Sequence, residues 1–138
     1  MKTLKEFGES GNLLIAAHRG SSGHAPENTL SAFQLAWVQG ANMIETDIQF
    51  TSDNHIVAVH DHKHFKGQMI DSTYTLKDYK KLDAGSWFSP EFKDEKVPAL
   101  EEILEFAKNK LYINLELKVY DKPIEYEQIE LLLKIIYQ

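Results

Sequence analysis

The stretch IAAHRGSSGHAPENT, residues 15–29, changes from strand-forming residues to a loop rich in glycine and serine at His18-Arg19-Gly20. A histidine moves protons near neutral pH, and the fork of an arginine binds phosphate oxygens. This pair at the carboxyl end of a strand therefore suits a site that handles phosphate. The interpretation depends on partners elsewhere in the chain, because a single pair of this kind proves little.

Short segments rich in Val, Ile or Leu predict four strands, at residues 13–18, 43–50, 55–60 and 111–119. Between the first two, apolar residues recur at helical spacing from Leu30 to Val38. Asn28 or Thr29 can cap the start of this helix, and Gly40 can end it. The first third of the chain is therefore predicted to be a βαβ unit.

The remaining connections are less regular. The segment TSDN, residues 51–54, joins the second and third predicted strands, which leaves open a tight hairpin or a short parallel connection. Farther along the chain, helices are predicted within residues 75–82, 99–110 and 124–137.

Composition limits the class of protein. The chain has 138 residues, of which 43% are hydrophobic and 26% charged, which is typical of one globular domain spanning residues 1–138. A formal net charge of −6 disfavours nonspecific binding to nucleic acid or to an anionic membrane. The absence of cysteine excludes disulfides and thiolate metal sites. The sequence contains no apolar run of about 18 residues, the length needed for stable insertion into a membrane. Its first residues also lack the apolar segment of a signal peptide, so we expect a cytoplasmic chain.

Acidic residues share one face of two predicted strands, because side chains alternate along a strand. Glu45 and Asp47 lie on one face of segment 43–50, and Glu116 and Lys118 lie on one face of segment 111–119. Three carboxylates suit a hard divalent cation, which also offsets their mutual repulsion. The pattern predicts a site for Mg²⁺ or Ca²⁺. The alternative for Glu45 and Asp47 is a solvated strand face paired with lysines.

Two histidines, His18 and His60, each close a predicted strand and are candidates for a proton donor and a proton acceptor. Arg19 and Lys118 are candidates to bind phosphate oxygens, Arg through its fork and Lys as a point charge. Taken singly, each of these residues also fits an ordinary solvated or structural role.

A competing hypothesis comes from the run HDHKH, residues 60–64, because His60, His62 and His64 share the alternation of a His-x-His zinc site. The polar, turn-like residues that follow His60 indicate that the strand ends there, which argues against a zinc site. A zinc enzyme similar to the amidohydrolases remains an alternative.

The motifs HRG, PENT, ETD, HD and ELK, taken in this order and spacing, resemble those of the glycerophosphodiester phosphodiesterase family. The stretch LDAGSWFSPEFKDEKVPALEEIL, residues 82–104, also resembles the family's link between a strand and the next barrel helix. The resemblance covers nearly the whole chain from Leu13 to about Val119. One departure is Ala99, where the family often has a threonine able to cap the following helix.

This resemblance implies an α/β fold, a TIM-type (β/α) barrel with its site at the carboxyl ends of the strands. The implied roles are metal ligands for Glu45, Asp47 and Glu116, proton transfer for His18 and His60, phosphate contacts for Arg19 and Lys118, and support of the site for Glu27 and Asn28. The implied reaction is hydrolysis of a glycerophosphodiester to glycerol phosphate and an alcohol. The resemblance leaves open which histidine is the acid, whether water or the glycerol 2-hydroxyl attacks, and which head group is preferred.

Length separates this sequence from a complete barrel. Eight strands with their helices take about 250 residues, whereas this chain has 138, so about the first half of a barrel is predicted. The open edges of the first and last strands are expected to favour self-association, and the alternative is that these residues are a piece of a longer enzyme. A non-catalytic half-domain that binds phosphate or a partner chain is the remaining alternative.

Overall fold

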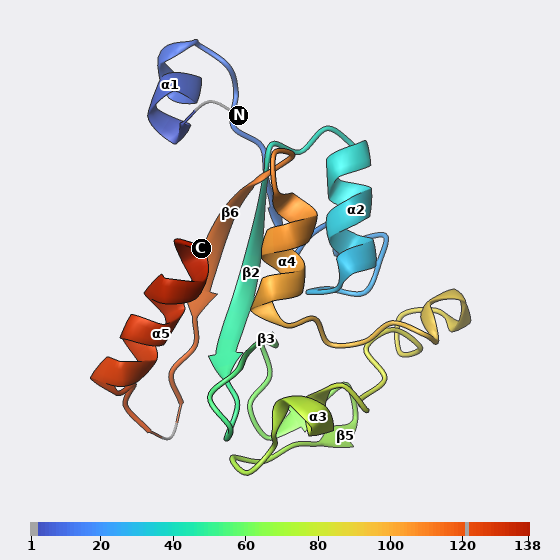
Figure 1. Ribbon diagram of the computed structural model, residues 1–138. Helices are drawn as coiled ribbons and strands as arrows, with labels where there is room; N and C mark the ends of the chain where they lie inside the picture. The colour runs from blue at the N-terminus through green and yellow to red at the C-terminus, as the bar shows by residue number, and fades with distance from the viewer. Residues whose placement is uncertain (1–2, 121) are drawn as a thin grey trace.

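Strand β2 is the centre of the fold, with helices beside it and shorter strands at its sides and its end (Figure 1). The computed structural model of the protein describes residues 3–120 and 122–138. The elements in chain order are α1 (Leu4–Glu9), β1 (Ala16–His18), α2 (Leu30–Val38), β2 (Met43–Phe50), β3 (Ile56–Ala58), β4 (His64–Phe65), β5 (Gln68–Met69), α3 (Leu76–Tyr79), the 3₁₀ helix η1 (Pro90–Phe92), α4 (Leu100–Ala107), β6 (Tyr112–Leu117) and α5 (Tyr126–Ile136).

The sheet is built from parallel strands on both sides of β2. β1 pairs with the start of β2, so that His18 lies opposite Glu45, and β6 pairs with β2 over six positions, so that Asp47 lies opposite Glu116. The arrows of β2 and β6 point toward the end of the molecule where α3 and β5 lie, and α1 lies at the other end (Figure 1). The predicted βαβ unit is therefore present as β1, α2 and β2, and the carboxyl ends of three parallel strands meet at one edge.

β3 resolves the connection that the sequence left open. It runs antiparallel to the end of β2, with Ile48 opposite Ala58 and Phe50 opposite Ile56. A tight turn joins the two strands, in which Asn54 has a φ of 59°. Segment 55–60 thus contains the return strand of a hairpin, and among the described residues three of the four predicted strands are parallel to one another.

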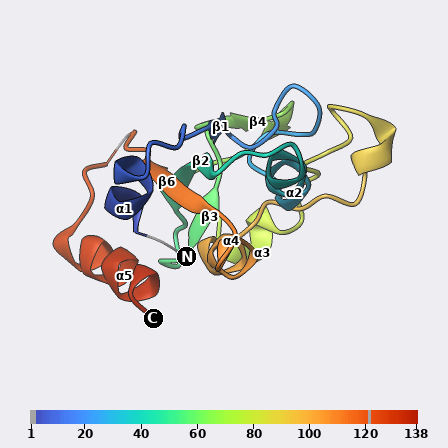
Figure 2. The same cartoon turned by 90° about the horizontal axis from the view of Figure 1, so that it is seen from above.

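The main core lies between β2 and two helices. α2 and α4 stand side by side along the sheet (Figures 1 and 2). Phe33 of α2 and Ile103 of α4 pack with Ile44 of β2 in one buried cluster. Because side chains alternate along β2, this packing turns Glu45 and Asp47 to the opposite face.

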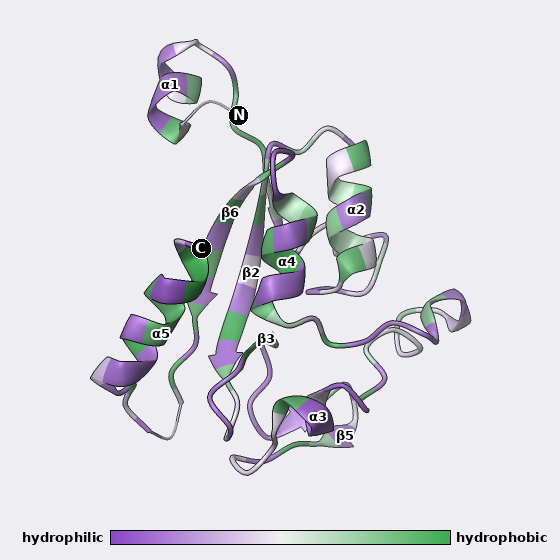
Figure 3. Ribbon diagram, in the orientation of Figure 1, coloured by the Kyte–Doolittle hydropathy of each residue, from purple (hydrophilic) through white to green (hydrophobic). Residues whose placement is uncertain are grey.

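Helix α5 lies beside β6, away from α2 (Figures 1 and 2). Its Leu132 and Ile135 pack against a buried cluster that contains Ile48. Polar and apolar residues alternate along this helix (Figure 3), and none of its residues is fully buried. Within the described ranges, no helix has the length and apolar character needed to span a bilayer.

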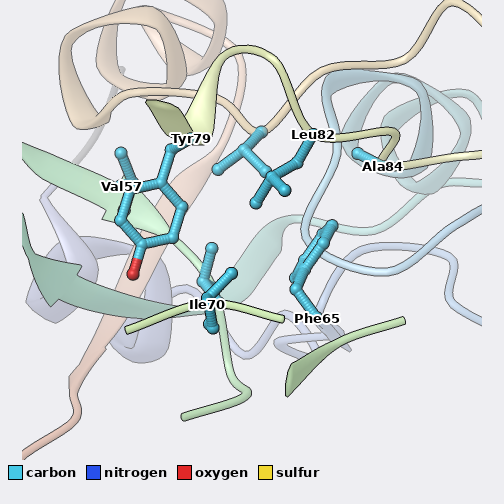
Figure 4. Close-up of a cluster of buried hydrophobic side chains, with 8 residues drawn as sticks. Val57, Phe65, Ile70, Tyr79, Leu82 and Ala84 are labelled. Carbon is cyan, nitrogen blue, oxygen red and sulfur yellow. The ribbon is translucent and has the colours of Figure 1, made fainter. Parts of the chain in front are cut away.

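A second core lies beneath the β4–β5 hairpin, in a region where the sequence indicated only polar, turn-prone chain. Phe65 of β4 and Ile70 after β5 pack there with Tyr79 of α3 and with Val57 of β3 (Figure 4). These apolar contacts fix the hairpin to β3. As a result, residues 60–70 are held beside the carboxyl end of β2.

The loop that follows β1 turns back onto α2, which explains the abrupt change at His18-Arg19-Gly20. The amide of Ser21 donates to the carbonyl of Ala32 at 3.0 Å, and the amide of Asn28 donates to the carbonyl of Arg19 at 3.0 Å. Gly20 has a φ of +78°, and a Cβ at this position would lie 2.7 Å from the carbonyl carbon of Ala32. Only glycine allows both this conformation and this close approach.

We predict that Gly20→Ala lowers the free energy of unfolding by about 2 kcal/mol or more, because overpacking and a left-handed backbone each cost about 1–2 kcal/mol. Gly23→Ala is the matched control in the same loop, since a Cβ there meets nothing within 4 Å. It should change stability by less than about 0.5 kcal/mol. Urea unfolding followed by circular dichroism measures both variants, and equal stabilities would contradict the packing described for Gly20.

Candidate active site

Asp47 is the most deeply buried charge at the carboxyl ends of the strands, with no side-chain exposure. Its Oδ2 atom accepts a hydrogen bond from Asn28 Nδ2 at 3.0 Å and lies 3.0 Å from Arg19 Nε. Its Oδ1 atom lies 3.1 Å from Lys118 Nζ. A buried carboxylate is costly unless it is paired and hydrogen-bonded, and here three segments of the chain provide these partners.

The contacts of Asp47 keep it ionised. Burial disfavours its charged form, but the amide of Asn28 and the cations of Lys118 and Arg19 outweigh burial and hold the pKa of Asp47 below its usual value. Lys118 also donates to Glu116 Oε1 at 2.6 Å. This hydrogen bond, together with the contact to Asp47, outweighs the burial of Lys118 and raises the pKa of the ammonium.

Three carboxylates meet beside this network. Glu45, Asp47 and Glu116 each present an oxygen atom, and these atoms lie within 4.8 Å of one another. Glu45 Oε1 is buried and has no hydrogen-bond partner among the described residues, and Asp47 Oδ1 has only the ion pair with Lys118. Oxygen donors with unfilled coordination fit a hard cation such as Mg²⁺ or Ca²⁺. The predicted ligand set is thus brought together from β2 and β6.

His18 lies at the rim of the cluster. Its side chain is 68% exposed, and Nε2 lies 3.8 Å from Glu45 Oε2. The same Glu45 oxygen accepts a hydrogen bond from the backbone amide of Arg19 at 3.0 Å. One carboxylate oxygen of Glu45 therefore fixes the end of β1, while the other has no hydrogen-bond partner in the part of the chain that the structure describes.

Glu27 and Asn28, the predicted supporting residues, have different contacts. Asn28 Oδ1 accepts hydrogen bonds from the Thr46 hydroxyl at 2.8 Å and from the Asp47 amide at 3.3 Å, so this side chain ties the loop to β2. Glu27 Oε1 lies 3.2 Å from Arg19 Nη1 and 2.9 Å from Lys66 Nζ. Arg19 and Asn28 both have left-handed backbones, with φ of 56° and 57°. Strained backbone of this kind persists only where surrounding contacts hold it, and it is concentrated at functional sites.

His60 follows β3 and belongs to the same end of the sheet. Its Nδ1 atom lies 3.3 Å from Asp61 Oδ1, and its side chain is 37% exposed. A carboxylate beside one ring nitrogen fixes the orientation of an imidazole and leaves the other nitrogen available. Asp61 itself was not identified from the sequence, although it directly follows His60 in the HD motif.

The histidine run does not assemble a zinc site. Among residues 3–120 and 122–138, the three carboxylates above are the only group of three or more potential metal-ligating side chains. His62 stacks on Tyr120, with ring centroids 4.4 Å apart. The strand alternation assumed for His60, His62 and His64 is also interrupted, because β3 ends at Ala58 and β4 begins only at His64.

Comparison with known proteins shows the family to which this chain belongs. Residues 18–136 match the Glycerophosphoryl diester phosphodiesterase family, and the chain belongs to this family. YhdW of Bacillus subtilis (strain 168) is 42% identical over 119 residues, which are 84% of this chain and 49% of that protein. A glycerophosphodiester phosphodiesterase of Caldanaerobacter subterraneus subsp. tengcongensis is 41% identical over 109 residues, which are 76% of this chain and 45% of that protein.

Similar solved structures identify the fold as part of a TIM-type barrel. An Oleispira antarctica phosphodiesterase, solved in complex with the product sn-glycerol-3-phosphate, matches with a TM-score of 0.80 and 36% identity. The match covers 94% of this chain and 54% of that one. The chain spans about half the length of the curated relatives that it matches.

We predict that the carboxylate cluster binds Mg²⁺ or Ca²⁺ and that Glu45→Gln weakens this binding at least about 10²-fold, since even loss of an outer partner costs 10–100-fold. Glu45 is the best ligand to change, because Asp47→Asn would also remove the buried counter-charge that Arg19 and Lys118 share. Glu101→Gln, an exposed change on α4, should leave binding unaltered. Isothermal titration calorimetry measures the affinity of the wild type and of both variants for Mg²⁺ or Ca²⁺. If Glu45→Gln binds the cation as tightly as the wild type, Glu45 is not a ligand.

Proposed function

We propose that this chain carries the metal, phosphate and proton-transfer residues of a glycerophosphodiester phosphodiesterase. The observation that supports this most directly is the convergence of Glu45, Asp47 and Glu116 beside His18 and Arg19 at the carboxyl ends of parallel strands. The similar Oleispira antarctica enzyme was solved with sn-glycerol-3-phosphate, which is the product expected here.

In the proposed reaction, an attacking oxygen forms a bond to phosphorus as the bond to the alcohol oxygen breaks. One of His18 and His60 accepts the proton of the attacking hydroxyl, and the other gives a proton to the departing alkoxide. Arg19 has donors beyond those facing Glu27 and Asp47, and these would bind phosphate oxygens together with the ammonium of Lys118. If water attacks, the products are glycerol phosphate and an alcohol. If the glycerol 2-hydroxyl attacks, the alcohol leaves first, and water then opens the resulting cyclic phosphate to glycerol phosphate.

Glu45, Asp47 and Glu116 would hold a divalent cation, Mg²⁺ or Ca²⁺. Such an ion supplies charge stabilisation at a phosphate oxygen when it is bound. Asn28 holds Asp47 from the loop, and Glu27 holds Arg19, so both residues would keep the site in order without exchanging protons.

We predict that His18→Ala and His60→Ala each lower the rate of glycerophosphocholine hydrolysis by about 10²- to 10⁴-fold, which is typical for loss of a general acid or base. His64→Ala is the matched control, since this exposed histidine lies in the same region but outside the proposed site. Release of glycerol phosphate in the presence of Mg²⁺ or Ca²⁺ measures the rate. If His62→Ala or His64→Ala lowers the rate as much as His60→Ala does, that result would favour the zinc hypothesis instead.

Chelation gives an independent check of the cofactor. An excess of chelator should abolish hydrolysis, and Mg²⁺ or Ca²⁺ should restore it. Restoration by Zn²⁺ alone would contradict the assignment. A wild-type chain that binds phosphate and cation but releases no product would favour the non-catalytic half-domain.

We also propose that the sheet edges mediate self-association. Within the described residues, β1 and β6 each pair only with β2, and the approach to β1 exposes Leu13, Leu14 and Ile15. Unpaired strand edges beside exposed apolar side chains favour association with another chain.

Sedimentation velocity over a range of concentrations should show a mass that increases with concentration for this 138-residue chain. Leu13→Lys, at the side chain that is 77% exposed, should shift the equilibrium toward the monomer. Strict monomer behaviour of the unmodified chain at every concentration would contradict the proposal.

A further inference from the structure

The backbone that carries His60 is fixed by side chains from two other elements. Gln49 of β2 donates through Nε2 to the carbonyls of Val59 at 2.7 Å and of Asp61 at 2.8 Å. The hydroxyl of Tyr120, which follows β6, donates to the carbonyl of His60. Three consecutive carbonyls, on and around His60, are therefore held by side chains rather than by strand pairing.

Gln49 belongs to the strand that carries Glu45 and Asp47, and Tyr120 lies in the segment that follows β6, the strand of Glu116. Gln49 lies two residues after Asp47 and is buried on the same face of β2. Tyr120 follows Glu116 and Lys118 directly after β6. A displacement of β2 or β6 would therefore move the carboxylates and His60 together.

The phenol of Tyr120 lies between the carboxylate cluster and the segment that carries His60. Burial is the largest influence and raises the pKa of Tyr120, while the charges of Lys118, Asp47, Asp61 and Glu116 also act on it. The phenol ring stacks on His62 at 4.4 Å, so the ring and the hydroxyl contact the chain on both sides of Asp61.

We propose that Gln49 and Tyr120 are positioning residues, which act through the backbone of residues 59–61 to hold the His60 imidazole in register with the carboxylate cluster. This inference rests on the proposed role of His60 in proton transfer. Small misplacements of a reacting group are costly, since about 1 Å can lower a rate about 10²-fold. The amide of Gln49 suits this role because it offers two hydrogens to two carbonyls.

Tyr120→Phe removes only the hydroxyl and keeps the ring that stacks on His62, at a side chain that is 42% exposed. We expect kcat to fall about 10- to 10²-fold, with KM changed less than about two-fold, because the substrate contacts are untouched. Gln49→Met keeps the length of the side chain but removes both hydrogen-bond donors, and it should also lower kcat. Tyr137→Phe, at a tyrosine that is 83% exposed and remote, is the control.

A double-mutant comparison separates positioning from a general loss of stability. In a His60→Ala background, Tyr120→Phe should lower the rate no further, because there is no imidazole left to position. A further 10-fold loss in that background would overturn the proposal.

Nuclear magnetic resonance of the imidazole nitrogens tests the proposal without turnover. Tyr120→Phe should shift or broaden the His60 ring signals while those of His18 and His55 stay as in the wild type, and Mg²⁺ affinity should be unchanged. If the wild type shows no hydrolysis, the proposed function fails. The His60 ring signals of the variants still show whether Gln49 and Tyr120 position the imidazole. Unaltered His60 signals in both Tyr120→Phe and Gln49→Met would overturn it.

Discussion

Burial of the Asp47 carboxylate is the constraint on which the rest of this structure depends. A charge without solvent exposure needs partners with opposite charge or hydrogen-bond donors, and Asp47 takes them from Arg19, Asn28 and Lys118. Arg19 and Asn28 come from the two ends of the loop between β1 and α2, and Lys118 directly follows β6, so a single side chain ties this loop and the end of β6 to β2. The two loop residues have left-handed backbones, and the amide of Asn28 donates to the carbonyl of Arg19.

This constraint also organises the chemistry. One buried oxygen of Glu45 has no hydrogen-bond partner among residues 3–120 and 122–138, and Glu116 lies next to Asp47 in the strand register. Arg19 and Lys118 both contact Asp47, and Lys118 also contacts Glu116, so the cations of the site lie among its carboxylates. A site that holds both kinds of charge suits a phosphodiester, whose oxygens can be bound by a metal ion and by cationic donors.

Alternation along β2 and β6 was sufficient to predict which carboxylates share a face, because the other side of β2 is buried, that of β6 is half-buried, and the register between them is fixed. The direction of β3 could not be predicted, since a four-residue connection permits more than one geometry. Helix α1 carried a signal that was missed, the capping box formed by Thr3 and Glu6.

The contacts within the site were harder to predict than its residues. Arg19 and Lys118 were expected to bind phosphate, and their pairing with Asp47 depends on a tertiary approach that no local pattern encodes. The β4–β5 hairpin was hidden because Lys66-Gly67 is a weaker turn signal than Asn-Gly, and because Phe65 and Ile70 are isolated in a polar stretch. Gln49 shares the phase of Glu45 and Asp47, but only the fold shows that its amide reaches the carbonyls beside His60.

The central claim is that Glu45, Asp47 and Glu116 form one site for a hard divalent cation. Anomalous diffraction from crystals of this chain soaked in Mn²⁺, which accepts the same oxygen ligands, tests this claim most directly. The account predicts one strong peak at bonding distance, about 2.0–2.6 Å, from an oxygen of each of the three carboxylates. A peak on the histidines of residues 60–64, or no peak near Glu45, would contradict it.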